Sequence, residues 1–191
     1  MAELFVEILG KPHGFIVFQL LAACRFTIYL SLIAFVGGGA VACLVTLLRI
    51  SNVPSLQKFA TSFIWIFQSI PLLMLLFLIG LGMPRLLDVN VDPWTAATIS
   101  LVLFTAAYLA EVWRGAIESV ARGQWEASYA LNIRYSLLLR DIILPQAIKF
   151  GVAPTVGFMV QIIKGTSLAY IIGFNDLMLV GKRWANAPVL G

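Results

Sequence analysis

The sequence predicts an all-α, polytopic membrane protein, and its composition and its long apolar segments are the basis of this prediction. Apolar side chains make up 61% of the 191 residues and charged side chains only 12%, whereas soluble domains have about 45–50% apolar and about 25% charged residues. A soluble fold of this size would have too few polar side chains to cover its surface. The apolar segments are long and do not alternate with polar residues, which argues against buried strands. The composition also excludes a disordered chain, a nucleic-acid-binding domain and a disulfide-rich secreted domain.

Four segments are expected to be membrane spans. A helix needs about 20 apolar residues to cross a hydrocarbon layer about 30 Å thick, because it rises about 1.5 Å per residue. The expected spans are roughly residues 26–48, 59–81, 93–113 and 146–164. The apolar stretch 14–24 either extends the first helix or lies in the membrane interface. Pro145 is expected to mark the start of the fourth span, and the glycine-interrupted residues after Lys164 to form a loop with short helical pieces.

The distribution of basic residues predicts the orientation in the membrane. The net charge is +4, and basic residues concentrate in the loop 49–58 and in the segment 114–149. The loop 82–92 instead sets Arg85 against two aspartates. The positive-inside rule therefore places the first and third of these segments in the cytoplasm and the second outside, so that the N-terminus is outside. In this scheme Lys182 and Arg183 fall on the outer side, against the rule.

The segment 114–145 is too polar to span a membrane and too long for a simple turn. Residues 124–131 are good helix formers, Gly123 is a candidate helix start, and Asn132 suits the left-handed conformation that ends a helix. One face of the expected helix is small and apolar, and it consists of Ala127, Ala130 and Leu131. Such a face suits docking into a groove of another protein. An amphipathic helix lying on the membrane surface without a partner explains the pattern equally well.

This segment resembles the EAA loop of ABC-transporter permeases. The family pattern is Glu-Ala-Ala, three residues, Gly, nine residues, Ile, one residue, Leu-Pro. Here the same spacing runs through Glu126-Ala127-Ser128, Asn132 and Ile142-Ile143-Leu144-Pro145. Serine replaces the second alanine and asparagine replaces the glycine, and both changes are mild because Ser is small and Asn tolerates a positive φ. The segments 108–117 and 163–168 and Gln146 resemble the polar amino-acid uptake branch, with its histidine, glutamine, glutamate and arginine importers.

The resemblance implies a single transmembrane permease domain over residues 1–191, in a multi-pass protein of the bacterial inner membrane. Such permeases pair as homo- or heterodimers, bind two ATP-binding-cassette ATPase subunits in the cytoplasm, and receive substrate from an extracytoplasmic binding protein. The implied ATPase-coupling residues are Gly123, Gln124, Glu126, Ala127, Ser128, Ala130, Leu131 and Asn132. ATP and Mg²⁺ would be bound by the partners, and no cofactor is expected in this chain. The family's fifth span is expected to be missing at the C-terminus.

Polar residues late in the fourth expected span are candidates for a substrate pathway. Polar groups at membrane depth are costly and mark functional sites or paired groups. Two glycines and a proline between residues 151 and 157 predict a broken helix, and broken helices often hold substrate near the membrane midplane. Lys164 would pair with a substrate carboxylate, or alternatively extend to the outer interface. The candidate pathway residues are Gln161, Lys164, Thr166 and Ser167.

No arrangement of residues in the sequence is typical of catalysis. The single histidine, His13, lies far from any acidic cluster, and neither a phosphate-binding loop nor a metal-binding cluster is present. Glu111 is expected to pair with Arg114 one turn later rather than with substrate. The sequence therefore predicts a non-catalytic membrane subunit without a nucleic-acid partner. The alternatives are a self-contained channel or ion-coupled transporter, which would need intramembrane acids that the spans almost lack, and a membrane scaffold that transports nothing.

Overall fold

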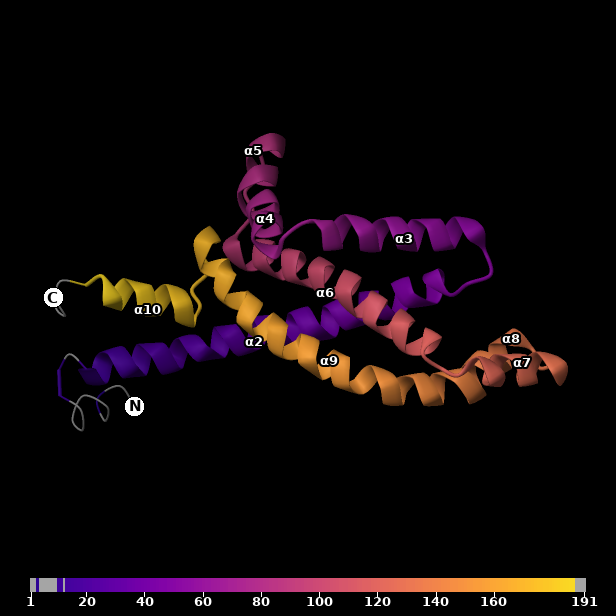
Figure 1. The fold of residues 1–191 in the computed structure, drawn as a ribbon. Helices are drawn as coiled ribbons and strands as arrows, with labels where there is room; N and C mark the ends of the chain where they lie inside the picture. The colour runs from indigo at the N-terminus through magenta and orange to yellow at the C-terminus, as the bar shows by residue number, and fades with distance from the viewer. Residues whose placement is uncertain (1–2, 4–9, 12, 188–191) are drawn as a thin grey trace. The chain divides into compact units, whose positions relative to one another are not determined.

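The described part of the chain folds into helices joined by short connections, as predicted. The computed structural model describes residues 3, 10–11 and 13–187, and this part of the chain contains no strand (Figure 1). The chain divides into two compact units. Unit 1 comprises Met1–Val36, Ile70–Val102 and Ile162–Gly191, and unit 2 comprises Gly37–Ser69 and Leu103–Gln161.

Three helical stretches among the described residues are long and apolar enough to cross a membrane. They are α2 (His13–Arg49), α6 (Pro93–Glu118) and the continuous stretch Tyr135–Ile172. A broken pair, α3 (Pro54–Ser69) followed by Leu72–Leu87, makes a fourth if it is counted as one span. Helix α2 includes residues 14–24, so this stretch extends the first helix.

The second expected span, 59–81, is not one continuous helix, and it is one span only if the bent pair is counted together. Helix α3 ends at Ser69, Pro71 has an extended backbone with a ψ of 140°, and α4 (Leu72–Phe77) begins after it. A proline donates no backbone hydrogen bond and pushes the residue before it out of the helical conformation. The absence of charge that predicted the span therefore does not guarantee an unbroken helix.

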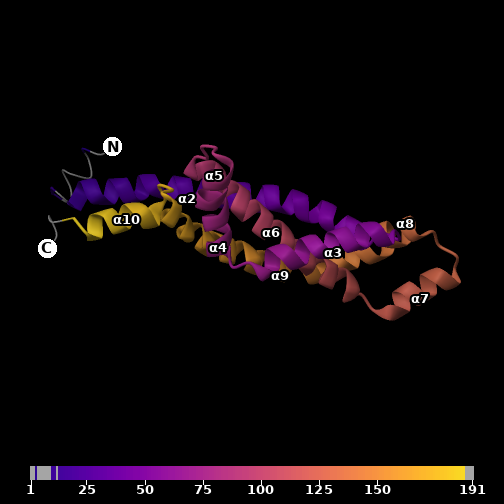
Figure 2. The ribbon, with the colours of Figure 1, turned by 90° about the horizontal axis from the view of Figure 1, so that it is seen from above.

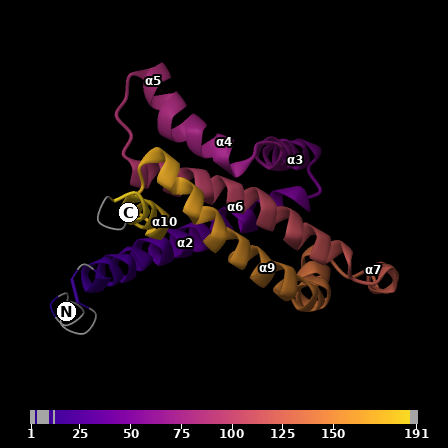
Figure 3. The same ribbon diagram turned by 60° about the vertical axis from the view of Figure 1, so that its left-hand side comes forward.

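The rest of this segment remains helical beyond α4. A π-helical turn spans Leu78–Gly82 and leads into α5 (Met83–Leu87), which has Pro84 in its first turn. Figure 3 shows α4 running on into α5. The first turn of a helix tolerates proline because its N–H groups have no partner within that helix.

The fourth expected span, 146–164, is neither broken nor begun at Pro145. Helix α9 (Leu144–Thr166) passes through Pro154 without ending. It is preceded without interruption by α8 (Tyr135–Leu137) and a π-helical turn, and it is followed by a 3₁₀ helix; the last two cover Leu138–Ile143 and Ser167–Ile172. Long apolar helices tolerate an internal proline where neighbouring helices, hydroxyl side chains or small backbone adjustments satisfy the carbonyl that it frees.

In unit 1, α10 (Leu177–Ala185) lies beside the first part of α2 (Figures 1 and 2). The indole N–H of Trp184 donates to the amide oxygen of Gln19 at 2.8 Å. The Trp184 ring also meets Phe15 edge to face, with ring centroids 6.0 Å apart. The residues expected as a loop with helical pieces are thus a 3₁₀ helix and a short α-helix.

In unit 2, a buried apolar cluster joins the end of α6 to the start of the last long helical stretch. Its members are Ile117, Val120, Leu138, Ile143 and Ala147. Trp125, Ile133 and Tyr135 pack against the cluster, and the Tyr135 hydroxyl donates to the Ile50 carbonyl at 2.8 Å. This cluster fixes the place at which the polar segment after α6 returns to the long apolar helix.

Candidate functional site

The expected coupling segment forms a nine-residue helix, α7 (Arg122–Ala130). Ala121 precedes it with an extended backbone, and its carbonyl accepts the Gln124 N–H at 2.9 Å. Gly123 lies inside the first turn and is not the helix start, which corrects the prediction. The reason is that an extended residue whose carbonyl accepts the first hydrogen bond can start a helix without a capping side chain.

Helix α7 ends as the sequence predicts, on a left-handed asparagine. Asn132 has a φ of 57°. Its N–H donates to the Tyr129 carbonyl at 3.0 Å, and the N–H of Ile133 donates to the Ser128 carbonyl at 3.0 Å. These two bonds make a Schellman motif, which satisfies carbonyls that the end of a helix leaves unpaired. The apolar Ile133 then packs on the cluster of unit 2.

The two sides of α7 differ in what covers them. Ser128 is 2% exposed, and its hydroxyl donates to the Gln124 carbonyl at 2.6 Å. Trp125 packs on the buried cluster. The remaining predicted coupling residues are exposed: Gly123, Gln124, Glu126, Ala127, Ala130, Leu131 and Asn132. Leu131, at 74% exposed, and the two alanines thus form an apolar face that no described residue of this chain covers.

Of the predicted pathway residues, Thr166 and Ser167 line a pocket of about 430 Å³ in unit 1. Their hydroxyls donate to the carbonyls of Ile163, at 2.8 Å, and Lys164, at 2.6 Å. Gln161 and Lys164 are exposed on α9, and Lys164 does not line this pocket. The hydroxyls that line the pocket can still accept hydrogen bonds through their free lone pairs.

The same pocket is lined by an acidic and a basic residue, Asp176 and Lys182, which the sequence did not indicate as site residues. Asp176 is 1% exposed, and its carboxylate accepts the Leu179 N–H at 2.8 Å as the N-cap of α10. Burial raises the pKa of the Asp176 carboxyl above its usual range. The Lys182 ammonium donates to the Tyr170 hydroxyl at 2.7 Å and lies 4.0 Å from the centre of that ring. An aspartate directly before an apolar run is a helix-start signal that could have located this cap.

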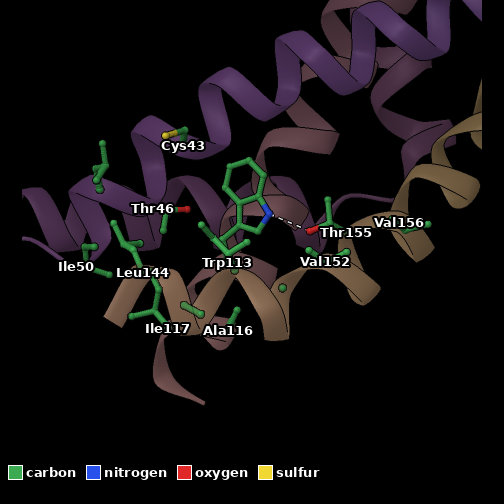
Figure 4. Close-up of a pocket in the computed structure, with 14 residues that line it drawn as sticks. Cys43, Thr46, Ile50, Trp113, Ala116, Ile117, Leu144, Val152, Thr155 and Val156 are labelled. Carbon is green, nitrogen blue, oxygen red and sulfur yellow. Dashed lines mark hydrogen bonds between the residues drawn. The ribbon is translucent and has the colours of Figure 1, made fainter. Parts of the chain in front are cut away.

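A second pocket of about 430 Å³, in unit 2, is apolar (Figure 4). Its walls come from α2, α6 and α9. The indole N–H of Trp113 points at Thr155 and donates to its hydroxyl at 3.0 Å, while the Thr46 hydroxyl donates to the Ala42 carbonyl at 2.8 Å. None of the described residues that line this pocket is charged. A charged ligand would lose its hydration there without gaining a partner, so the pocket does not suit ionic cargo.

Another pocket of unit 2, with a volume of about 270 Å³, is polar. It is lined by Arg49, Thr61, Ile64, Trp65, Gln68, Glu111 and Arg114. The predicted pair between Glu111 and Arg114 is confirmed, because the Arg114 Nε and Nη2 donate to the two carboxylate oxygens at 2.9 and 2.5 Å. Arg114 also pairs with Glu118. Sequence reasoning did not connect Arg49, Trp65 and Gln68 with this pair.

The family model for binding-protein-dependent transport system inner membrane components matches residues 34–190. The chain is 34% identical to the probable amino-acid ABC transporter permease protein YckA of Bacillus subtilis, over 82% of this chain and 69% of that protein. It is 33% identical to the probable glutamine ABC transporter permease protein GlnM of the same species, over 80% of this chain and 70% of that protein.

Solved structures agree with these sequence relatives. The crystal structure of an amino acid ABC transporter with histidines matches with a TM-score of 0.83 and 27% identity, over 88% of this chain and 78% of that one. The MetNI methionine ABC transporter, at 19% identity and a TM-score of 0.67, shares the fold. The chain belongs to the family of inner membrane components of binding-protein-dependent transport systems, and its relatives there are permeases of amino-acid ABC transporters.

Proposed function

We propose that this chain is the permease subunit of an ATP-binding-cassette importer that moves polar amino acids into the cell. Its relatives are named for glutamine, arginine and cystine transport, which supports a polar amino acid as cargo. Two ATPase subunits in the cytoplasm would bind ATP and Mg²⁺. A second permease subunit and an extracytoplasmic binding protein would complete the transporter, with the N-terminus of this chain outside.

The observation that carries this proposal is the uncovered apolar face of α7. Ala127, Ala130 and Leu131 are exposed, although apolar side chains gain free energy when they leave water. A short helix with a small apolar face fits a groove on a partner subunit. ATP-driven closure of the two ATPases would then move α7 and open the permease alternately to the inside and to the outside.

For the cargo we propose a path along the last part of α9, through Gln161, Lys164, Thr166 and Ser167. The pocket of unit 1 supports this path, because Asp176 and Lys182 bring opposite charges to the walls that Thr166 and Ser167 line. A free amino acid carries one positive and one negative group and needs partners of both signs where water is excluded.

The test replaces Ala127 with arginine in the assembled transporter. We expect Ala127→Arg to reach the membrane in normal amount, to lose the ATPase subunits on purification in mild detergent, and to abolish amino-acid uptake. The reason is that a long charged side chain cannot enter an apolar groove that fits alanine. Ser136→Arg is the matched control, because Ser136 is also small and exposed but lies on α8, outside the apolar face. If Ala127→Arg kept both the ATPases and uptake, α7 would not be the coupling helix.

A further inference from the structure

The polar pocket of unit 2, lined by Arg49, Thr61, Ile64, Trp65, Gln68, Glu111 and Arg114, has a charge pattern that the coupling function does not use. We propose that this basic pocket is a binding site for amino-acid cargo, in which the Arg49 guanidinium holds the α-carboxylate. The inference rests on the proposed function, because it gives the transported amino acid a second, separate position in the permease.

The two arginines of the pocket are paired unequally. Arg114 is held by Glu111 and Glu118. Among the described residues, the Arg49 guanidinium makes no hydrogen bond or ion pair, and it interacts with Glu111 only at longer range. Arg49 is therefore the lining residue of the pocket whose guanidinium N–H groups are free to bind a ligand. A guanidinium presents its N–H groups as a planar fork that matches a carboxylate with two parallel bonds.

Arg49 is half-buried, so its guanidinium is partly withdrawn from water without a paired anion in the described part of the chain. It is the last residue of α2, and Glu111 and Arg114 lie within α6, both of which are long and apolar enough to span the membrane. Ionisable groups in such helices face the protein interior or a water-filled cavity rather than lipid. A pocket that gathers three of them is thus placed where a polar solute can reach it, and the vacant donors indicate that this solute carries negative charge.

The other walls supply acceptors for an ammonium group. The Gln68 Nε2 donates to the Ala107 carbonyl at 3.3 Å, which orients the amide and leaves its oxygen free. Each Glu111 oxygen accepts one bond from Arg114 and keeps a further lone pair. Trp65, which is 71% exposed, offers an aromatic face that attracts a cation. The pocket thus presents donors for a carboxylate and acceptors for an ammonium, the two groups of an α-amino acid.

Size and chemistry separate this pocket from the apolar pocket of unit 2. Its volume of about 270 Å³ lies just below the range of about 300–1,000 Å³ for sites that bury drug-sized ligands, which suits a smaller molecule. The apolar pocket is larger but has no charged wall. The competing account is that Arg49 only completes an ion network that braces α2 against α6. An ion network with only this structural role would not be affected by cargo.

The test begins with the cargo itself. Uptake of radiolabelled L-glutamine, L-arginine, L-histidine and L-cystine is measured for the assembled transporter in proteoliposomes. If none is taken up, the proposed function fails and this inference falls with it. For the amino acid that is transported, Arg49→Gln and Arg49→Lys are compared with Arg85→Gln, an exposed arginine in α5 of unit 1. We expect both Arg49 variants to raise KM about ten- to a hundredfold, the usual range for losing a charge-assisted hydrogen bond, while Arg85→Gln leaves it unchanged.

A second measurement separates binding from bracing and does not depend on transport. Thr61 lines the pocket, so Thr61→Cys, in a chain with Cys24 and Cys43 changed to serine, places a thiol on its wall. Saturating cargo should slow modification of this thiol by a charged thiosulfonate reagent at least about tenfold, and the α-carboxamide of the same amino acid should not. Uptake with an unchanged KM in both Arg49 variants, or equal modification rates with and without cargo, would refute the site while leaving the proposed function intact.

Discussion

The left-handed residue at the end of α7 fixes how this helix ends, so we expect substitutions there to weaken the proposed coupling in graded steps. Asn132 has a φ of 57°, a conformation that glycine adopts freely, asparagine tolerates and other L-residues resist. We expect Asn132→Gly to match or exceed the natural protein in the stability of the α7 end. Asn132→Ala should be weaker, and Asn132→Val weaker still because its side chain is branched at Cβ.

The size of the effect follows from the geometry of the cap. For an ordinary L-residue the left-handed backbone conformation costs about 1–2 kcal/mol of free energy. This corresponds to a factor of about 5–30 in the population of the capped state. That state carries two hydrogen bonds, from Asn132 to Tyr129 and from Ile133 to Ser128. Because Ile133 also packs on the buried cluster, losing the cap loosens both the end of the helix and its attachment.

Hydrogen–deuterium exchange measures this directly at the amides of residues 132 and 133. Exchange in Asn132→Ala should be faster than in Asn132→Gly by about 5–30-fold, with a parallel drop in co-purified ATPase. Asn186→Ala is the matched control. Asn186 ends α10 with a φ of −96°, so alanine at this position does not have to adopt the left-handed conformation. Equal exchange in the alanine and glycine variants at position 132 would mean that the conformation of this residue does not hold α7.

Two further predictions concern packing and pH. A Cβ at Gly165 would lie 2.9 Å from Leu72 Cδ2, a side-chain tip that must turn aside, whereas one at Gly157 meets nothing within 4 Å. Gly157→Ala should therefore raise the free energy of unfolding by about 0.5–1 kcal/mol, and Gly165→Ala should stabilise the protein less, an order that equal thermal midpoints in detergent would contradict. Burial raises the pKa of Asp176, so the unfolded chain releases this proton at a lower pH than the folded chain, and stability falls as pH rises from the unfolded pKa through the folded pKa. Asp176→Asn keeps a good N-cap and should remove that part of the pH dependence, as thermal melting at a series of pH values would reveal.

Hydropathy was sufficient to predict α2 and α6, because a charge-free segment of about 20 residues has few alternatives to a spanning helix. It was insufficient around prolines, whose effect depends on the turn in which each one lies. Pro71 ends a helix, whereas Pro154 lies inside α9. The sequence contains both residues in apolar surroundings, and only the local backbone distinguishes them.

The residues of the candidate sites were likewise predictable from the sequence where they depend on near neighbours, and not where they depend on tertiary packing. The left-handed Asn132 and the pair Glu111–Arg114 were predictable because both depend on neighbours within one or two turns. The basic pocket was not, because it joins Arg49 to Gln68 and to α6 across three helices. Spacing along a chain gives no distance between residues that only packing brings together.

Two π-helical turns explain how the chain passes through prolines near helix starts. The N–H of Met83 donates to the Leu78 carbonyl and that of Leu144 to the Leu139 carbonyl, each five residues back. The proline that follows each turn, Pro84 or Pro145, has no N–H to give to the carbonyl four residues back, and a wider turn relieves that mismatch.

The second of these turns has a mechanical consequence. Because the helix is continuous from Tyr135 into α9, only the short connection of residues 131–134 separates α7 from the last long helical stretch. Leu138 and Ile143 in this turn belong to the cluster on which Trp125 of α7 packs. We infer that a displacement of α7 by its partner reaches α9 through close-packed side chains, since packed interiors transmit strain rather than absorb it. Shortening Leu138 to alanine should therefore weaken coupling while leaving the apolar face of α7 itself unchanged.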